Sequence, residues 1–243
     1  NIKFDMLELR KYGVQVKGKL FDTMVAHYLL NPEMRHGMDY MAETYLNYKT
    51  IHIEELIGQK GKNQLNMRDI SPKIVCDYAS EDADITLKLK NILEKEIIKN
   101  NLSDLLDKIE LPLIYVLADM EWEGARLDLD ALAVLSKEMT QELHQVETPK
   151  QIGEVLFDHL KIVDKAKKTK TGQYKTSEEE LEKLQHKHPI IGKILEQRGI
   201  KKLLSTYIDS FPQLINSKTG KVHTSYNQTV AATGRLSSTN PNL

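Results

Sequence analysis

The sequence predicts a mainly α-helical protein with some β-structure, which places it in the α/β class overall. Apolar residues recur at helical spacing over long stretches, whereas stretches of strand-like alternation are short. The 243 residues are 40% hydrophobic with 12 Gly and 7 Pro, so the chain can bury a sizeable core and is neither collagen-like nor a Gly/Pro-rich linker. This length has room for one large domain or two ordinary ones.

Charge and cysteine content exclude several classes of protein. Lys and Arg number 34 against 35 Asp and Glu, which excludes a uniformly basic nucleic-acid coat but allows a local basic patch. The single cysteine, Cys76, excludes an internal disulfide framework and a cysteine-only zinc site. No apolar run reaches the roughly 18–20 residues of a membrane span, and no signal peptide is recognisable. We therefore expect a soluble intracellular protein without a membrane partner.

Local patterns give the expected elements along the chain. Helical periodicity predicts helices over residues 24–30, 39–46, 71–98, 104–123 and 130–147. Alternation predicts two short strands, over residues 15–21 and 221–228. Residues 218–221 are expected to form a hairpin turn in which Gly220 takes a positive φ.

One region is markedly basic. Residues 161–202 contain 12 Lys or Arg against 6 Asp or Glu, a balance of about +6, so the remaining chain carries about −7. This asymmetry suggests a face that binds nucleic acid, and a solvated surface without special function is the alternative. Within it, residues 165–172 have no apolar period and predict a mobile basic loop. Ser177 and Glu180 have capping-box spacing, which predicts a helix that begins at Glu178.

A further helix is expected after His188 and Pro189, over residues 190–208. Its core side is predicted to include Ile191, Ile194, Leu195, Leu203 and Tyr207. A basic cluster near its middle comprises Arg198, Lys201 and Lys202.

The predicted helix 71–98 carries a carboxylate on its apolar face. At about 100° per residue, that face is made of Ile74, Val75, Tyr78, Asp82, Ile85, Leu89, Ile92 and Leu93. Burying an unpaired carboxylate costs several kcal/mol, so Asp82 requires a cation, a metal or strong donors. Tyr78 lies one turn before it on the same face. A buried salt bridge and a metal site are both consistent with this pattern.

Two segments near the chain ends add candidates. Asp5 offers a second carboxylate, close to Asn1, although an acid there is usually solvated. Residues 229–239 are small, polar and nearly free of acid, with Arg235 among Thr and Ser. Such a segment can lie against a phosphate backbone, because small side chains let the main chain approach; a flexible exposed tail is the alternative.

Three strings of residues resemble one family. The run Asn1-Ile2-Lys3-Phe4-Asp5 is similar to its second exonuclease motif, and Tyr78-Ala79-Ser80-Glu81-Asp82 to its third. The run from Val222 to Gln228, followed by Thr233-Gly234-Arg235-Leu236-Ser237-Ser238, resembles its entry from thumb into palm. On these motifs the chain resembles the family A DNA polymerases, the family of the bacterial DNA polymerase I enzymes.

The resemblance implies an architecture and a function. Residues 1–100 would be the later part of a 3′–5′ exonuclease domain, a partial RNase-H-like fold. Residues 104–216 would be the helical thumb that grips duplex DNA, and residues 217–243 the first palm strands. The longer parent would be a DNA-directed DNA polymerase with 3′–5′ proofreading, acting in replication and repair in the bacterial cytoplasm.

The resemblance also assigns site residues. Asp5 and Asp82 match carboxylates that hold two divalent metals, with Mg²⁺ as the expected ion, and Tyr78 matches the tyrosine that positions the attacking water. Arg235 matches an arginine that reaches the minor groove at the primer terminus, where acceptors occur on every base pair. The residues expected to bind DNA are Asn1, Lys167, Lys168, Lys170, Thr176, Ser177, Arg198, Lys202 and Arg235.

The matches further imply that this chain is part of a longer protein. The family's first exonuclease motif would precede Asn1 and its palm carboxylates would follow Leu243, so we expect a catalytically incomplete segment that binds duplex DNA through the thumb. A deletion, or a disordered stretch left out of the numbering, is suspected between Glu147 and Thr148. The expected partners are primer–template DNA and a single-stranded 3′ end, with dNTPs for the parent alone, and the expected state is a monomer. The alternative is a non-catalytic DNA-binding module with a relic exonuclease domain.

Overall fold

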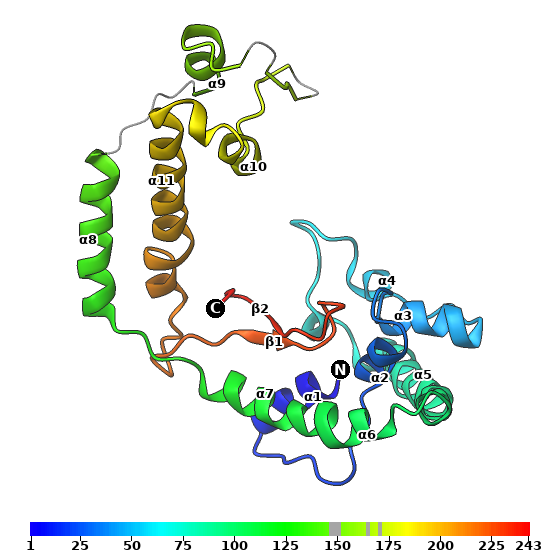
Figure 1. The fold of residues 1–243 in the computed structure, drawn as a ribbon. Helices are drawn as coiled ribbons and strands as arrows, with labels where there is room; N and C mark the ends of the chain where they lie inside the picture. Colours follow the sequence, from blue (N-terminus) through cyan, green and yellow to red (C-terminus); the bar gives the residue numbers. More distant parts are fainter. Residues whose placement is uncertain (146–151, 164–165, 170–171) are drawn as a thin grey trace. The chain divides into compact units, whose positions relative to one another are not determined.

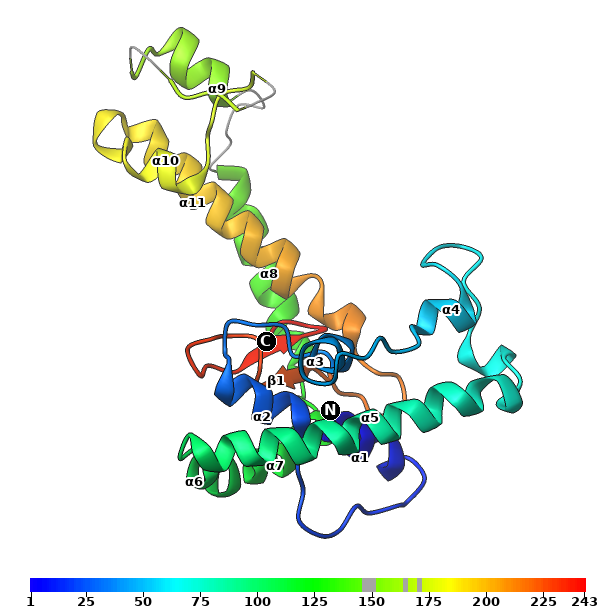
Figure 2. The ribbon, with the colours of Figure 1, turned by 90° about the vertical axis from the view of Figure 1, so that its right-hand side faces the viewer.

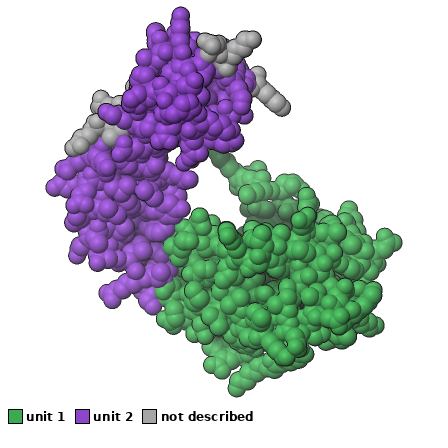
Figure 3. Space-filling model, in the orientation of Figure 1, with its two compact units in different colours: residues 1–124, 223–243 green, residues 125–222 purple. Residues whose placement is uncertain are grey.

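The computed structural model describes residues 1–145, 152–163, 166–169 and 172–243. The chain divides into two compact units, shown in different colours in Figure 3. Unit 1 comprises residues 1–124 and 223–243, and unit 2 comprises residues 125–222. The predicted class, mainly α with some β, is confirmed.

Unit 1 is a helical body with a small antiparallel sheet (Figure 1). Its helices are α1 (Ile2–Arg10), α2 (Thr23–Leu30), α3 (Met38–Met41), η1 (Ala42–Leu46), α4 (Ile53–Ile57), η2 (Met67–Asp69), α5 (Pro72–Lys99), α6 (Ser103–Leu105), η3 (Leu106–Glu110) and α7 (Leu111–Glu123). Strands β1 (Ser225–Asn227) and β2 (Ser237–Thr239) pair antiparallel, with Tyr226 opposite Ser238. The predicted helices 24–30, 39–46, 71–98 and 104–123 are therefore confirmed, with π-helical turns at η1 and η3.

The core of unit 1 is formed by side chains of α2, α3, η1, the second half of α5, η3 and α7. Figure 2 shows α2 beside α5. The fully buried side chains of this core include Ala26, Met41, Leu89, Leu93 and Ile114. The first half of α5 extends past this core, so Ile74 is 62% exposed and the predicted apolar face is buried only from Ile85 onward. This corrects the expectation of one continuous buried stripe.

A buried ion pair connects α1 to α7 and β1. The Lys3 ammonium pairs with the Glu121 carboxylate and donates to the Tyr226 carbonyl oxygen. Glu121 Oε1 also accepts a hydrogen bond from the Tyr226 N–H at 2.7 Å. Both charged side chains are about nine-tenths buried. Three segments distant in sequence are thus fixed to one another by charge-assisted hydrogen bonds.

Two histidines pack together inside unit 1. His27 is fully buried, and its Nδ1 lies 2.8 Å from Nδ1 of His36. Burial and the neighbouring His36 lower the pKa of His27 to about 4, and burial lowers the pKa of His36 as well. The folded protein therefore holds His27 in its neutral form well below pH 6.

This pair predicts acid destabilisation. An unfolded histidine titrates near pH 6.5, so between pH 6.5 and 4 the unfolded chain binds more protons and the free energy of unfolding falls as the pH falls. From pH 7 to pH 5 the loss through His27 is expected to be about 2 kcal/mol. Urea unfolding of the wild type and of His27→Gln at both pH values measures it, since glutamine keeps a polar partner for His36 without titrating. An equal pH dependence in the two proteins would contradict the prediction.

Unit 2 contains two long helices that lie side by side in Figures 1 and 2. Its helices are α8 (Leu129–Gln145), α9 (Ile152–Glu154), η4 (Val155–His159), α10 (Glu178–Glu182), η5 (Gln185–Lys187), α11 (Pro189–Leu203), η6 (Leu204–Ile208) and η7 (Phe211–Leu214). Ile200, Leu204 and Ile208 pack against the side chains of α8. A second cluster joins η4, α10 and the start of α11, around Leu156, Leu181 and Ile191.

Several local predictions for the basic region hold and others do not. A helix begins at Glu178 as predicted, and α11 with η6 covers the predicted helix 190–208. The predicted capping box does not form: the Ser177 side chain makes no cap hydrogen bond, and the Glu180 carboxylate accepts from Lys167 Nζ at 2.9 Å. Leu203, predicted on the core side, is 47% exposed, because the buried row is Ile200, Leu204 and Ile208.

The strand predictions are the least accurate. Residues 15–21 form no strand, because no other strand in the described part of the chain pairs with them. Leu20 is buried and Val16 is half-buried, so the apolar residues of this segment alternate because they pack on the core from a loop. The predicted strand 221–228 is reduced to β1 and a single bridge between Ala125 and Val222. The turn at 218–221 is confirmed, with Gly220 at φ +67°.

The predicted basic loop contains pairing that the sequence did not indicate. The Thr169 N–H donates to the Gln173 carbonyl at 2.7 Å, and Lys175 N–H to the Lys167 carbonyl at 2.8 Å. Residues 164–165 and 170–171, including Lys170, lie outside the described residues. So do Glu147 at the predicted helix end and the suspected deletion before Thr148.

Candidate functional site

Tyr78 and Asp82 lie together on α5, one turn apart. The two side chains interact, and each influences the pKa of the other. Asp82 as a whole is half-buried, but its Oδ1 atom is buried and has no hydrogen-bond partner. An unpartnered buried carboxylate oxygen is costly unless a cation binds it. This is the chemistry of a metal ligand, and no salt bridge to Asp82 is found in the described part of the chain.

Burial raises the pKa of Asp82, and the nearby carboxylates of Glu81 and Asp39 raise it further, against the hydrogen bond from Tyr78. Burial and the Asp82 carboxylate likewise raise the pKa of Tyr78, so the phenol stays protonated. The negative potential that disfavours ionisation of Asp82 favours a divalent cation beside it.

The two neighbouring acids, Glu81 and Asp39, already accept hydrogen bonds from other residues. Glu81 accepts from the Tyr48 hydroxyl at 2.6 Å and from the Ile51 N–H at 2.7 Å, so it ties the segment after η1 to α5. Asp39 accepts from the Thr50 hydroxyl at 2.9 Å, and its other oxygen lies 3.4 Å from His52 Nδ1. These contacts leave Asp82 Oδ1 as the oxygen that is free for a ligand within this acidic group.

A pocket of about 440 Å³ opens beside Tyr78. Its lining residues are Ile51, Glu55, Leu56, Ile70, Ile74, Asp77 and Tyr78. Most of these side chains are apolar, and they include the exposed Ile74.

Asp5 lies in the first turn of α1, and Asn1 precedes the helix as its N-cap. Asp5 is exposed, and the Asn1 side chain caps the helix by accepting from the Phe4 N–H at 3.3 Å. The structure places no contact between Asp5 and either Tyr78 or Asp82 among the residues it describes. Within the same residues, no three His, Cys, Asp or Glu side chains gather as a metal site.

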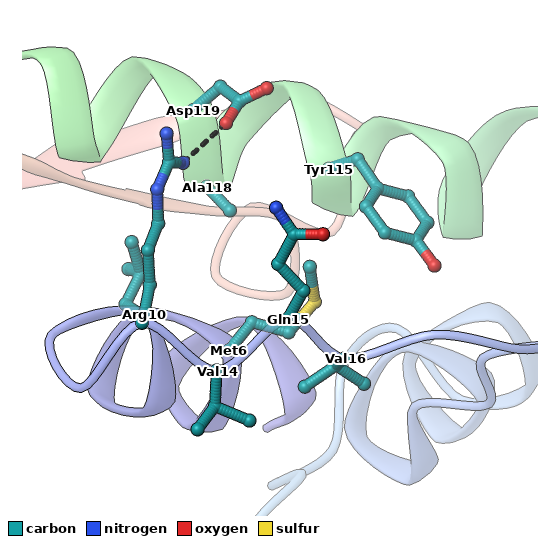
Figure 4. A pocket seen from close by; sticks show the side chains of 10 residues that line it. Met6, Arg10, Val14, Gln15, Val16, Tyr115, Ala118 and Asp119 are labelled. Carbon is teal, nitrogen blue, oxygen red and sulfur yellow. Dashed lines mark hydrogen bonds and ion pairs between the residues drawn. The ribbon is translucent and has the colours of Figure 1, made fainter.

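A second pocket, of about 380 Å³, lies between α1, the loop after it and α7 (Figure 4). The Arg10 guanidinium crosses its edge, pairs with Asp119 and stacks 4.7 Å from the Trp122 ring. None of the predicted site residues lines this pocket.

The predicted DNA-binding side chains of unit 2 differ in their interactions with the rest of the unit. Lys167 is paired with Glu180, and the Lys168 ammonium lies 4.6 Å from the centre of the Tyr174 ring. Arg198 is half-buried and donates to the carbonyl and hydroxyl oxygens of Thr176, so part of its guanidinium fixes the segment before α10. Lys202 is exposed on α11.

Arg235 follows a turn that is attached to α2. The Tyr28 hydroxyl donates to the Ala231 carbonyl at 2.7 Å and accepts from the Gly234 N–H at 3.0 Å. Gly234 has φ +78°, a conformation that suits glycine. Arg235 itself is exposed, and its guanidinium has no hydrogen bond or ion pair to the described residues.

Comparisons with known proteins match two functional classes in order along the chain. A family model for 3′–5′ exonuclease matches residues 1–98, and one for DNA polymerase family A matches residues 124–243. Asp82 lies in the segment that matches the exonuclease model, and the Arg235 turn lies in the segment that matches the polymerase model. The chain belongs to DNA polymerase family A.

Its relatives are bacterial DNA polymerase I enzymes. It is 39% identical to DNA polymerase I of Synechocystis sp. and 40% identical to that of Chloroflexus aurantiacus, each over 100% of this chain. The chain spans 26% and 28% of the length of these relatives. A solved structure, the POL domain of Pol1 from M. smegmatis in complex with DNA primer-template and dNTP, matches with a TM-score of 0.76 and 32% identity over 100% of this chain and 41% of that one. No described helix is long and apolar enough to cross a bilayer.

Sequence reasoning did not find three residues that shape these sites. Glu121 and Lys3 form their ion pair across 118 positions, and Tyr28 bonds to a residue 203 positions away. The available signal was chemical: a lysine on the inner side of α1, and a tyrosine in an apolar helix whose hydroxyl needs a partner when buried.

Proposed function

We propose that the whole protein is a DNA polymerase I, a DNA-directed DNA polymerase with a 3′–5′ proofreading exonuclease that acts in replication and repair in the bacterial cytoplasm. The observation that carries this proposal is the succession of exonuclease and family A polymerase matches within one chain. In it, residues 1–100 belong to an RNase-H-like exonuclease domain, residues 104–216 to the thumb and residues 217–243 to the start of the palm.

The exonuclease chemistry is assigned to three side chains. Asp82, with its buried and unpartnered Oδ1, and Asp5 are the proposed metal ligands. Mg²⁺ bound there would polarise the scissile phosphate and supply a nucleophilic water. Tyr78, kept protonated by its surroundings, holds the attacking water by a hydrogen bond. The apolar pocket beside Tyr78 supports this assignment, since a single-stranded 3′ end must present a base as well as a phosphate.

DNA binding is assigned to both units. Primer–template DNA and dNTPs are bound by the M. smegmatis polymerase domain, which this chain resembles over its whole length. In unit 2 the proposed phosphate contacts are Lys167, Lys168, Lys170, Thr176, Ser177, Arg198 and Lys202. In unit 1 they are Asn1 and, at the minor groove of the primer terminus, Arg235. The polymerase is proposed to act as a monomer.

Salt dependence of duplex binding tests the thumb assignment. Each phosphate neutralised contributes a log–log slope of about −0.9, so Lys202→Ala in the full-length polymerase should flatten the slope by about one unit. The loss should be the same for any duplex sequence, since phosphate contacts position DNA without reading it. Anisotropy titrations of a labelled primer–template at several salt concentrations measure the slope.

Lys202 is a cleaner probe than Arg198, because Arg198 also holds Thr176 and its removal would disturb the segment before α10. Lys137→Ala is the matched control, an exposed lysine on α8 that removes the same charge. Slopes that change equally in the two variants would mean that α11 is a solvated charged face. A complete absence of 3′–5′ hydrolysis by the full-length protein would favour the relic exonuclease instead.

A further inference from the structure

The turn before Arg235 is built on a side chain from the exonuclease region. Tyr28 belongs to α2 and is only 5% exposed, and its hydroxyl both donates to Ala231 and accepts from Gly234. The Gly234 N–H also lies 3.2 Å from the Ala231 carbonyl oxygen. One phenol oxygen thus joins the two ends of a tight turn, and both of its strong hydrogen-bonding directions are used.

Tyr28 is itself firmly placed. The Asp22 carboxylate caps α2 by accepting from the N–H groups of Met24 and Val25 at 2.9 and 3.0 Å. The Tyr28 ring packs edge-to-face against His36, with centroids 5.6 Å apart. A buried ring on a capped helix offers a rigid point of attachment, whereas the turn it holds is made of small, largely exposed residues with little packing of their own.

The next residue after this turn is Arg235. Because its guanidinium has no hydrogen bond or ion pair to the described residues, the backbone of the preceding turn is what fixes the point from which this side chain extends. We propose that Tyr28 is a positioning residue for DNA binding: its hydroxyl fixes the Ala231–Gly234 turn and thereby directs Arg235 toward the primer terminus. This proposal rests on the DNA-binding role of Arg235 proposed above, and it gives a residue of the exonuclease region a part in duplex recognition.

The test is a double-variant cycle in the full-length polymerase. Arg235→Ala should weaken primer–template binding about tenfold, the value of a charge-assisted hydrogen bond, and Tyr28→Phe about threefold, because it removes one hydroxyl. If Tyr28 acts through Arg235, the double variant should bind no more weakly than Arg235→Ala alone. If instead the loss of affinity in the double variant equals the product of the two single losses, the two residues act independently and the proposal is overturned.

A second measurement reports the turn without DNA. Hydrogen–deuterium exchange of peptides that cover residues 231–236 should be faster in Tyr28→Phe, because the Gly234 N–H loses an acceptor. Tyr45→Phe is the matched control: this half-buried tyrosine accepts from Asn31 at 3.1 Å in the same unit, and its loss should leave that exchange unchanged.

The two measurements separate the possible failures. Unchanged exchange in Tyr28→Phe would overturn the positioning role and leave the proposed function untouched. If exchange is faster in Tyr28→Phe but Arg235→Ala binds primer–template as tightly as the wild type, the proposed DNA-binding role of Arg235 is overturned, and the positioning role of Tyr28 in DNA binding is overturned with it. Faster exchange, weaker binding and no further loss in the double variant would support the proposal.

Discussion

Asp82→Ala in the full-length polymerase is expected to lower the rate of 3′–5′ hydrolysis by about 10³-fold or more, while primer extension stays near the wild-type rate. The reason is that Asp82 Oδ1 is buried and has no hydrogen-bond partner among the described residues, so we propose that it binds a cation. A metal ion that stabilises the attacking and leaving oxygens contributes several kcal/mol, and each 1.36 kcal/mol is a factor of ten in rate. Release of nucleotides from a labelled single strand measures the effect.

Asp84→Ala is the matched control for this variant. Asp84 is an exposed carboxylate on the same helix and pairs with Lys88 at 2.6 Å, so its loss removes the same charge but no candidate metal ligand. Tyr78→Phe should fall between the two, because it removes one oriented hydrogen bond and leaves the carboxylate in place. Wild-type hydrolysis by Asp82→Ala would rule out the metal-ligand role, whereas equal losses in Asp82→Ala and Asp84→Ala would point to the charge of α5 as a whole.

The sequence predicted the parts of this molecule that local forces determine. The periodicity of α5 and of α11 with η6 was sufficient, because a long amphipathic helix is specified by its own spacing. The pairing of Tyr78 with Asp82 followed from the same geometry, since residues four apart share a face. The strand predicted for residues 15–21 was wrong for the opposite reason. An alternating segment forms a strand only where another strand pairs with it, and whether such a partner exists depends on the tertiary fold.

Within the candidate sites, sequence reasoning named candidate functional side chains but did not predict the hydrogen-bond and ion-pair partners of those side chains. Ser177 was correctly placed before a helix, yet the predicted capping box does not form and Glu180 pairs with Lys167. Arg198 was assigned to DNA by resemblance, and its hydrogen bonds to Thr176 show a structural task in addition. Tertiary packing decides which of these competing partners a side chain meets, and the local sequence pattern does not predict that packing.

The largest effect on stability is expected from Lys3, in the run that resembles the second exonuclease motif. Lys3→Met leaves the Glu121 carboxylate buried without its counter-charge, and breaking a buried ion pair in this way costs about 3–5 kcal/mol. In this chain Trp122 is the single tryptophan, and it neighbours Glu121 on α7, so its fluorescence during urea unfolding reports on unit 1. Lys11→Met is the control, because the exposed pair of Lys11 with Glu8 should be worth less than about 1 kcal/mol.

A second substitution shows whether the buried charge is the cause. In Lys3→Met/Glu121→Gln, the glutamine oxygen can still accept from the Tyr226 N–H, which lies 2.7 Å from Glu121 Oε1, but no charge remains in the core. Most of the stability lost in Lys3→Met should therefore return, since removing both charges of a buried pair is often close to neutral. If the double variant is as unstable as Lys3→Met, the loss comes from the packing of the lysine side chain or from its bond to the Tyr226 carbonyl, and the ion pair contributes little to the attachment of α1 to α7.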